Sequence, residues 1–196
     1  MTKFALAATV LMFVALLAAV PADAASPVKC TTTIIGGTVS GDLVVPDGQT
    51  CILFQTTVTG NVMVRGTLSA LFVVISGNLI GEQAESLGLD ATTVGGNLVA
   101  VQTSGGPSHL CNSTIGGSVI VLQSSSSAFW NIGYVCDSGG LTVGLNLIFS
   151  NNTGGGFIAA NTIGGNLDCN ANTPAPTKPG SDNIVGGSKK GQCANF

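Results

Sequence analysis

The chain has 196 residues, of which 45% are hydrophobic and only 8% are charged, and its formal net charge is −3. With only six Lys and Arg in the whole chain, a basic phosphate-binding surface is excluded, and we expect no nucleic-acid partner. The 28 glycines, beside abundant Val, Ile, Leu, Thr, Ser and Asn, are typical of short strands joined by turns and exclude a disordered chain.

The first 25 residues have the pattern of a secretory signal peptide. Lys3 precedes an apolar run at 4–20 that only Thr9 interrupts, and the sequence ADA at 22–24 is a small-x-small cleavage site. We expect cleavage after Ala24 or Ala25, which leaves 26–196 as a single secreted β-solenoid domain with no membrane contact. An uncleaved anchor is the alternative, because the apolar run is at the short limit for spanning a bilayer.

Eight copies of one short unit follow the signal, with the central Gly at steps of 19, 17, 19, 21, 28, 20 and 22 residues and Leu145 in its place once. The copies are TVSGDLVV (38–45), TVTGNVMV (57–64), VISGNLIG (74–81), TVGGNLVA (93–100), TIGGSVIV (114–121), TVGLNLIF (142–149), TIGGNLDC (162–169) and IVGGSKKG (184–191). This period predicts an all-β fold, a right-handed parallel β-helix (solenoid) of about eight coils of roughly 20 residues each.

Each unit is interpreted as one strand with an inward and an outward side. The residue two before the Gly is always Val or Ile, and the residue two after it is Leu or Val until Lys189 in the last copy. Because positions two apart share a face, these residues are predicted to fill the core. A file of Thr and a file of Asn occupy the positions next to these inward residues. We expect both files to form hydrogen-bonded ladders along the stack.

The six cysteines are predicted to pair in sequence order. Cys30 to Cys51 spans 21 positions, Cys111 to Cys136 spans 25, and Cys169 to Cys193 spans 24, each about one coil. Residues one coil apart lie above each other at a distance that a disulfide bridges. Three disulfides indicate an oxidising, extracellular location. The Pro-rich segment between the last two cysteines then completes one more turn, and the pair of lysines at 189–190 is predicted to form a polar cap.

The chain offers little material for catalysis or metal binding. Glu82, Glu85 and Asp90 lie in a segment that we interpret as a solvated loop, although calcium ligation by them is conceivable. His109 is the only histidine, and no serine stands in a G-x-S-x-G context. We therefore predict no catalytic residues, no metal site, no cofactor and no enzymatic activity.

The stretched 28-residue step carries the only Trp and the only Tyr of the chain. It is predicted to lie beside His109, because Cys136 pairs with Cys111. A long loop that gathers rare aromatic residues is able to stack a sugar ring or to grip a partner. The alternative is that these aromatics fold back and cover the solenoid flank. The binding residues predicted on this edge are His109, Phe129, Trp130, Tyr134 and Asp137.

These observations favour a non-catalytic structural or surface-interaction protein of the extracellular space or cell envelope, with a cell-wall glycan or a surface protein as partner. The alternative is a carbohydrate-binding or carbohydrate-acting β-helix. An ice-binding protein is third, because a flat row of Thr on a β-helix is how some antifreeze proteins meet ice. The Thr row is interrupted here at Val74 and Ile184.

The opening CTTTIIGGTVSGDLVVPDGQTC and the ending TIGGNLDCNANTPAPTKPGSDNIVGGSKKGQC resemble a group of small exported actinobacterial proteins built on the same G-N-L repeat. The resemblance covers the chain beyond the signal and implies compartment and fold, but no activity. The repeat is also loosely similar to that of bactofilins, which are polymerising β-helices. Bactofilins are cytoplasmic and lack cysteines, so the resemblance implies no filament here.

Overall fold

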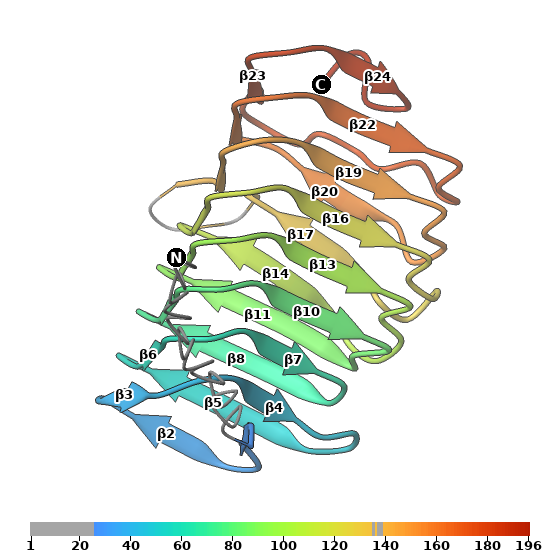
Figure 1. Ribbon diagram of the computed structural model, residues 1–196. Helices are drawn as coiled ribbons and strands as arrows, with labels where there is room; N and C mark the ends of the chain where they lie inside the picture. Colours follow the sequence, from blue (N-terminus) through green and yellow to red (C-terminus); the bar gives the residue numbers. More distant parts are fainter. Residues whose placement is uncertain (1–25, 135, 137–138) are drawn as a thin grey trace, which may run out of the picture.

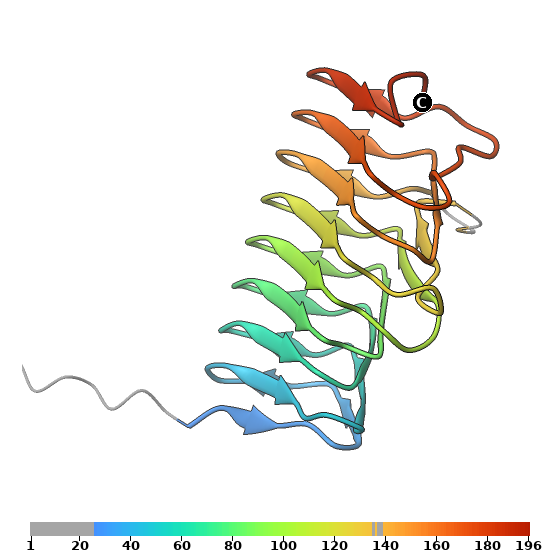
Figure 2. The same ribbon diagram turned by 90° about the vertical axis from the view of Figure 1, so that its right-hand side faces the viewer.

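A computed structural model describes residues 26–134, 136 and 139–196. The predicted signal peptide at 1–25 lies outside the described residues. The chain winds into a stack of about eight turns, each about one repeat long, and the successive coils climb steadily from one end to the other (Figure 1 and Figure 2). The predicted all-β parallel solenoid is therefore confirmed. No helix among the residues described is long and apolar enough to cross a membrane.

Three parallel sheets form the sides of the stack, and each sheet takes one strand from successive coils. Sheet A has nine strands: β1 (Val28–Lys29), β4 (Leu43–Val45), β7 (Val62–Val64), β10 (Leu79–Glu82), β13 (Leu98–Val101), β16 (Val119–Leu122), β19 (Leu147–Ser150), β22 (Leu167–Asn170) and β24 (Lys189–Gly191). Sheet B has seven: β2 (Thr33–Ile35), β5 (Thr50–Phe54), β8 (Thr67–Leu71), β11 (Ser86–Asp90), β14 (Ser108–Cys111), β17 (Trp130–Ile132) and β20 (Gly156–Ile158). Sheet C has eight: β3 (Thr38–Val39), β6 (Thr57–Val58), β9 (Val74–Ile75), β12 (Thr93–Val94), β15 (Thr114–Ile115), β18 (Thr142–Val143), β21 (Thr162–Ile163) and β23 (Ile184–Val185).

The repeated unit is two strands and not the single strand predicted from the sequence. In each copy the first two residues belong to sheet C, and the residues from two after the central Gly onward belong to sheet A, because the chain bends between them at the central Gly and the residue after it. The predicted inward positions are nevertheless correct. Residues two before and two after the Gly are buried in the middle coils, as Val94 and Leu98 are. The third strand of each coil, in sheet B, comes from the variable segment between units.

The Asn file forms the predicted ladder at this bend. The backbone N–H and the side-chain amide of Asn78 both donate to Oδ1 of Asn61, at 2.9 and 3.1 Å, and Asn97 repeats the pattern on Asn78. The Thr file on sheet C does not form a ladder. No hydrogen bond joins successive hydroxyls of this file, all of which lie in the described part of the chain, because the rungs are about 4.8 Å apart and a Thr side chain is too short to bridge them.

A second set of polar ladders lies inside the stack and was not predicted. Asn172 is buried, and its Oδ1 accepts from the backbone and side-chain amides of Asn152, at 3.0 and 2.9 Å. Its own side-chain amide donates to the carbonyl of Phe149 and to Oε1 of Gln192, both at 2.8 Å. Asn161 and Asn183 are linked in the same way at another corner. These ladders satisfy backbone groups that no strand pairs.

The three disulfides join Cys30 to Cys51, Cys111 to Cys136 and Cys169 to Cys193, with Cα atoms 5.3 to 5.4 Å apart. The predicted pairing is therefore confirmed. The segment between the last two cysteines completes a final turn, in which Thr177 pairs with Phe157 in place of an eighth strand of sheet B. Lys189 occupies the inward column of this turn, and Phe196 packs against the end of the core.

We expect Gly116→Ala to destabilise the protein by about 1–3 kcal/mol, because the stacked coils leave no room for a side chain at this bend. A Cβ on Gly116 would lie 2.4 Å from the carbonyl oxygen of Gly95 one coil below. Gly106→Ala is the matched control, since nothing lies within 4 Å of a Cβ at that position. Urea unfolding measures both, and equal midpoints for the two variants would contradict the stacking argument.

We expect Asn172→Ala to reduce the free energy of unfolding by about 2–4 kcal/mol, because it leaves several buried amide and carbonyl groups without partners. Asn97→Ala removes a rung of the outer ladder, where water replaces the lost bonds, and should cost about 1 kcal/mol. Denaturant unfolding of both variants checks the order. A larger loss for Asn97→Ala would show that the outer ladder matters more.

Candidate functional site

The outer face of sheet A carries a continuous row of aliphatic side chains. Strand register places one outward residue of each coil above that of the coil before it. We call this row the aliphatic stripe, and it consists of Val44, Met63, Ile80, Val99, Ile120 and Ile148. Met63 and Ile80 are 40% and 36% exposed, and the other four are half-buried by their neighbours in the row.

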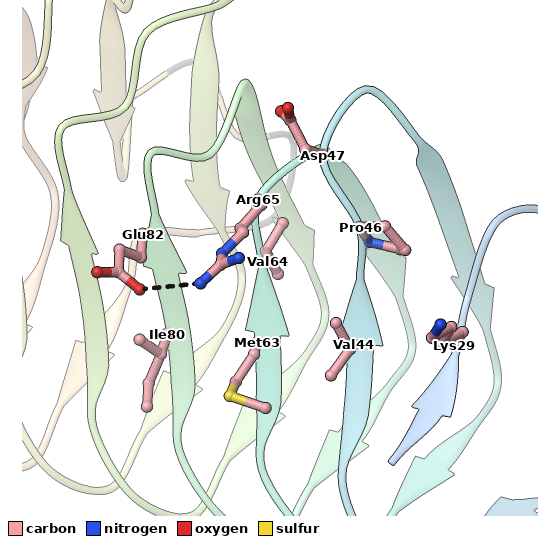
Figure 3. Close-up of a pocket in the computed structure, with 9 residues that line it drawn as sticks. All are labelled: Lys29, Val44, Pro46, Asp47, Met63, Val64, Arg65, Ile80 and Glu82. Atoms are coloured by element: carbon pink, nitrogen blue, oxygen red, sulfur yellow. Dashed lines mark ion pairs between the residues drawn. The ribbon is translucent and has the colours of Figure 1, made fainter. Parts of the chain in front are cut away.

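A shallow depression of about 350 Å³ lies at the N-terminal end of the stripe. Figure 3 shows Lys29, Val44, Met63 and Ile80 in one line across four strands, with Arg65 and Glu82 beside that line. Arg65 and Glu82 form an ion pair at 3.8 Å, and their side chains are 64% and 68% exposed. An exposed pair of this kind contributes little to stability and is free to move aside for a partner.

Charged residues stand only at the two ends of the row. Lys29 precedes Val44 in the register, and Asp168 follows Ile148, with Lys190 one strand further on. Asp168 accepts a hydrogen bond from the side chain of Asn170. The stripe is therefore an apolar strip with Lys29 at one end and, at the other, Asp168 followed by Lys190.

His109 is exposed on the outer face of sheet B, as its prediction as a binding residue requires. Its register neighbours are Gly88 and Asn131. The imidazole lies over Gly88, where a Cβ would be 2.6 Å from its Cε1 atom, so a larger residue at this position would make the imidazole shift. Phe157 follows Asn131 in the same column.

Phe129, Tyr134 and Phe157 form a half-buried aromatic cluster next to this column. Phe157 packs edge-on against Phe129 and Tyr134, with ring centroids 4.8 and 5.0 Å apart. The Pro-rich segment lies beside the same cluster, since a Cβ on Gly155 would have both Pro174 and Phe129 within 4 Å, and a Cβ on Gly180 would have Tyr134 within 4 Å. Its Lys178 donates a hydrogen bond to Asp182, and this bond and the charge of Lys178 lower the pKa of the Asp182 carboxyl.

Trp130 is not on this surface. Its side chain is fully buried, points into the stack, and donates from Nε1 to Oγ of Ser124 at 3.0 Å. Ser108 and Gly156 occupy the same column one coil below and above, and their small size makes room for the indole. Asp137 lies outside the described residues. Of the five predicted binding residues, the structure therefore brings His109, Phe129 and Tyr134 to one side of the solenoid.

The acidic segment at 82–90 is not a loop, because most of it forms β10 and β11. Glu85 accepts from Thr67 Oγ1 at 3.0 Å, and Asp90 accepts from the amide of Asn112 at 2.8 Å. Glu82 pairs with Arg65 on the outside of sheet A. The three carboxylates thus have three different partners. Nowhere in 26–134, 136 and 139–196 do three metal-ligating side chains gather.

The Thr row of sheet C faces outward over most of its length, so one condition for ice binding is present. The second outward column, two positions further along, is Gly from residue 95 onward. A Cβ at Gly95, Gly116 or Gly144 would lie 2.1 to 2.5 Å from a carbonyl oxygen of the coil below. From Gly95 onward the close stacking therefore leaves no room for a second file of Thr, so only a single row continues along the solenoid.

Comparisons of the chain with protein families, with curated proteins and with solved structures find no match in any of the three. The function must therefore be argued from the surfaces of this molecule. The aliphatic stripe was not predicted, although it is visible in the sequence. In the first six copies the residue three positions after the central Gly is aliphatic, and in the last two it is Asp and Lys. The sixth copy is counted from Leu145, which stands in place of the Gly.

We expect Trp130→Ala to lower the free energy of unfolding by about 3–5 kcal/mol, because it empties a buried site between two small neighbours. His109→Ala, on the exposed side of the next strand, should leave stability within about 0.5 kcal/mol of the unchanged protein. Thermal unfolding and glycan-array binding of both variants separate the roles. A stable Trp130→Ala protein that loses glycan binding would support a sugar site instead of a core role.

Proposed function

We propose that this protein is an exported, non-catalytic structural or surface-interaction protein whose contact surface is the outer face of sheet A. The observation that carries the proposal is the aliphatic stripe. Parallel sheets are ordinarily covered on both faces, and their strands then read as near-continuous apolar runs. The strands of sheet A have this composition, yet in the described part of the chain nothing covers their outer side.

The geometry of the stripe supports a contact role. Six aliphatic residues in register form a strip about 24 Å long, since the rungs are about 4.8 Å apart. Contiguous apolar surface of this kind on a soluble protein is characteristic of interaction sites. Paired cysteines support an extracellular location, in agreement with the signal peptide that the sequence predicts and with the resemblance to small exported repeat proteins.

The proposal assigns no catalytic role to His109. A histidine that acts as a general base stands within hydrogen-bond reach of a nucleophile and is oriented by a further group. The column neighbours of His109 are Gly88 and Asn131, which supply neither a nucleophile nor a carboxylate.

Carbohydrate binding is the alternative, and one observation favours it: exposed His109 lies in the column that leads through Asn131 to Phe157, and Phe129 and Tyr134 flank that ring. Half-buried rings of this kind present edges for sugar contacts. The same rings already pack on one another beside the Pro-rich segment, which is a structural role. For this reason we rank the sheet B surface below the aliphatic stripe.

We expect the double variant Val99→Lys/Ile120→Lys to lose the native association of the protein, because two cations would be buried in an apolar contact. The matched control is Thr93→Lys/Thr114→Lys, which adds the same charges to the same two coils on sheet C. The measurement is size-exclusion chromatography of culture fluid and mild envelope extracts, with detection of the protein by antibody.

The unchanged protein and the sheet C control should elute in a species larger than the monomer. The sheet A variant should elute as a monomer, with at least about a tenfold loss of the larger species. Circular dichroism confirms that each variant folds. A wild-type protein that is monomeric in every fraction, or a loss that is equal in both variants, would contradict the proposal.

A further inference from the structure

We propose that the partner of the aliphatic stripe is the stripe of a second copy, packed face to face with the two stacks antiparallel. This inference rests on the proposed function in one respect, because both use the outer face of sheet A. It goes further by naming the occupant and the register. It is carried by the order of side chains along the row.

The order of residues along the row allows two copies in opposite directions to pair apolar residues with apolar residues and Lys29 with Asp168. Counted from the N-terminal end of sheet A, Lys29 is in the first strand, the six stripe residues are in the second to the seventh, Asp168 is in the eighth and Lys190 is in the ninth, which has no strand opposite it in the register below. A two-fold axis parallel to the strands, midway between Ile80 and Val99, places the first strand of one copy opposite the eighth of the other. Contacts across such an axis occur twice, which is the usual form of a homodimer interface.

In this register each apolar residue meets another apolar residue. Val44 lies opposite the partner's Ile148, Met63 opposite the partner's Ile120, and Ile80 opposite the partner's Val99. Lys29 meets the partner's Asp168 at both ends of the interface. Complementary charges at the ends fix register and orientation, while the apolar centre supplies the affinity.

Other arrangements of the same two faces set charged residues against aliphatic side chains or against like charges. A shift by one strand in one direction sets Asp168 against Val44, and a shift in the other sets Lys29 against Ile148, so each leaves a charge against an aliphatic side chain at the cost of its solvation. A parallel pair sets Lys29 against Lys29 and Asp168 against Asp168. The antiparallel register, with six apolar pairings and two ion pairs, is therefore selected against its neighbours.

The size of the face predicts a weak, reversible dimer. Nine strands about 4.8 Å apart and three or four residues wide give a projected area on the order of 500 Å² per copy. Stable interfaces bury about 800 Å² on each partner. We therefore expect a monomer–dimer equilibrium with a dissociation constant in the micromolar range, where about tenfold changes are easily measured.

The test is a charge exchange on the purified, disulfide-bonded protein, followed by sedimentation velocity over a range of concentrations. Lys29→Asp and Asp168→Lys should each weaken the dimer at least about tenfold, because each places like charges together twice. The double variant Lys29→Asp/Asp168→Lys should restore the dissociation constant to within about threefold of the unchanged protein. Thr114→Asp on sheet C, also exposed, is the control for added charge and should have no effect.

Zero-length carbodiimide coupling gives a second readout that does not depend on variants. In the dimer it should join the amine of Lys29 to the carboxylate of Asp168 on the partner, with loss of one water. Within one chain these residues are seven strand spacings apart, about 34 Å, so an amide between them must join two copies. Peptide mapping by mass spectrometry identifies the link.

The inference is overturned by a protein that stays monomeric up to about 1 mM, a concentration well above the expected dissociation constant. A dimer that ignores both charge reversals, or an open-ended series of species that indicates end-to-end stacking, also overturns it. If the purified protein is monomeric while Val99→Lys/Ile120→Lys still removes the larger species from extracts, the second copy is wrong and the contact face remains correct.

Discussion

The constraint on which this structure depends is the in-register stacking of parallel strands. Each strand forms its backbone hydrogen bonds with the equivalent strand one coil away, so every column of the solenoid holds one position of the repeat. Each residue must therefore pack or bond with the equivalent residues in the coils above and below it. Aliphatic columns fill the core, glycine columns allow the close approach of backbones, and amide columns bond along the stack. The same rule acts on the outside, where it turns one aliphatic position per repeat into a continuous stripe.

Columns that repeat one residue type could be predicted from the sequence, and columns that vary could not. The number of coils, the inward Val and Leu, the Asn ladder and the disulfide pairs all follow from a constant spacing, and the structure confirms them. The strands of sheet B were missed because Thr50–Phe54 and Trp130–Ile132 share no pattern. Trp130 lies inside because Ser108 and Gly156 leave volume for it in the adjacent coils. That exchange of size between coils cannot be seen until the register across the 28-residue step is known.

The residues of the candidate site were also hard to identify from the sequence. The aromatic residues of the long step stand out because they are rare, and rarity suggested a binding role. The aliphatic stripe does not stand out, because Leu-Val-Ala-Val resembles any buried parallel strand. Only the structure shows that one side of sheet A faces solvent. The informative feature is an apolar column on the solvent side of sheet A. Its position depends on the bend that separates sheet A from sheet C.

The C-terminal end of the stack is closed to further strands, whereas one side of it carries an exposed apolar row. Lys189 takes an inward position in the last turn, Phe196 packs against the end of the core, and a disulfide joins the last two coils. These features disfavour growth along the stack, which is the direction in which an open parallel edge would otherwise add strands. The side keeps an apolar row with opposite charges at its ends. A contact made there under two-fold symmetry buries the row in both copies at once and leaves no free face of the same kind, so the assembly is finite.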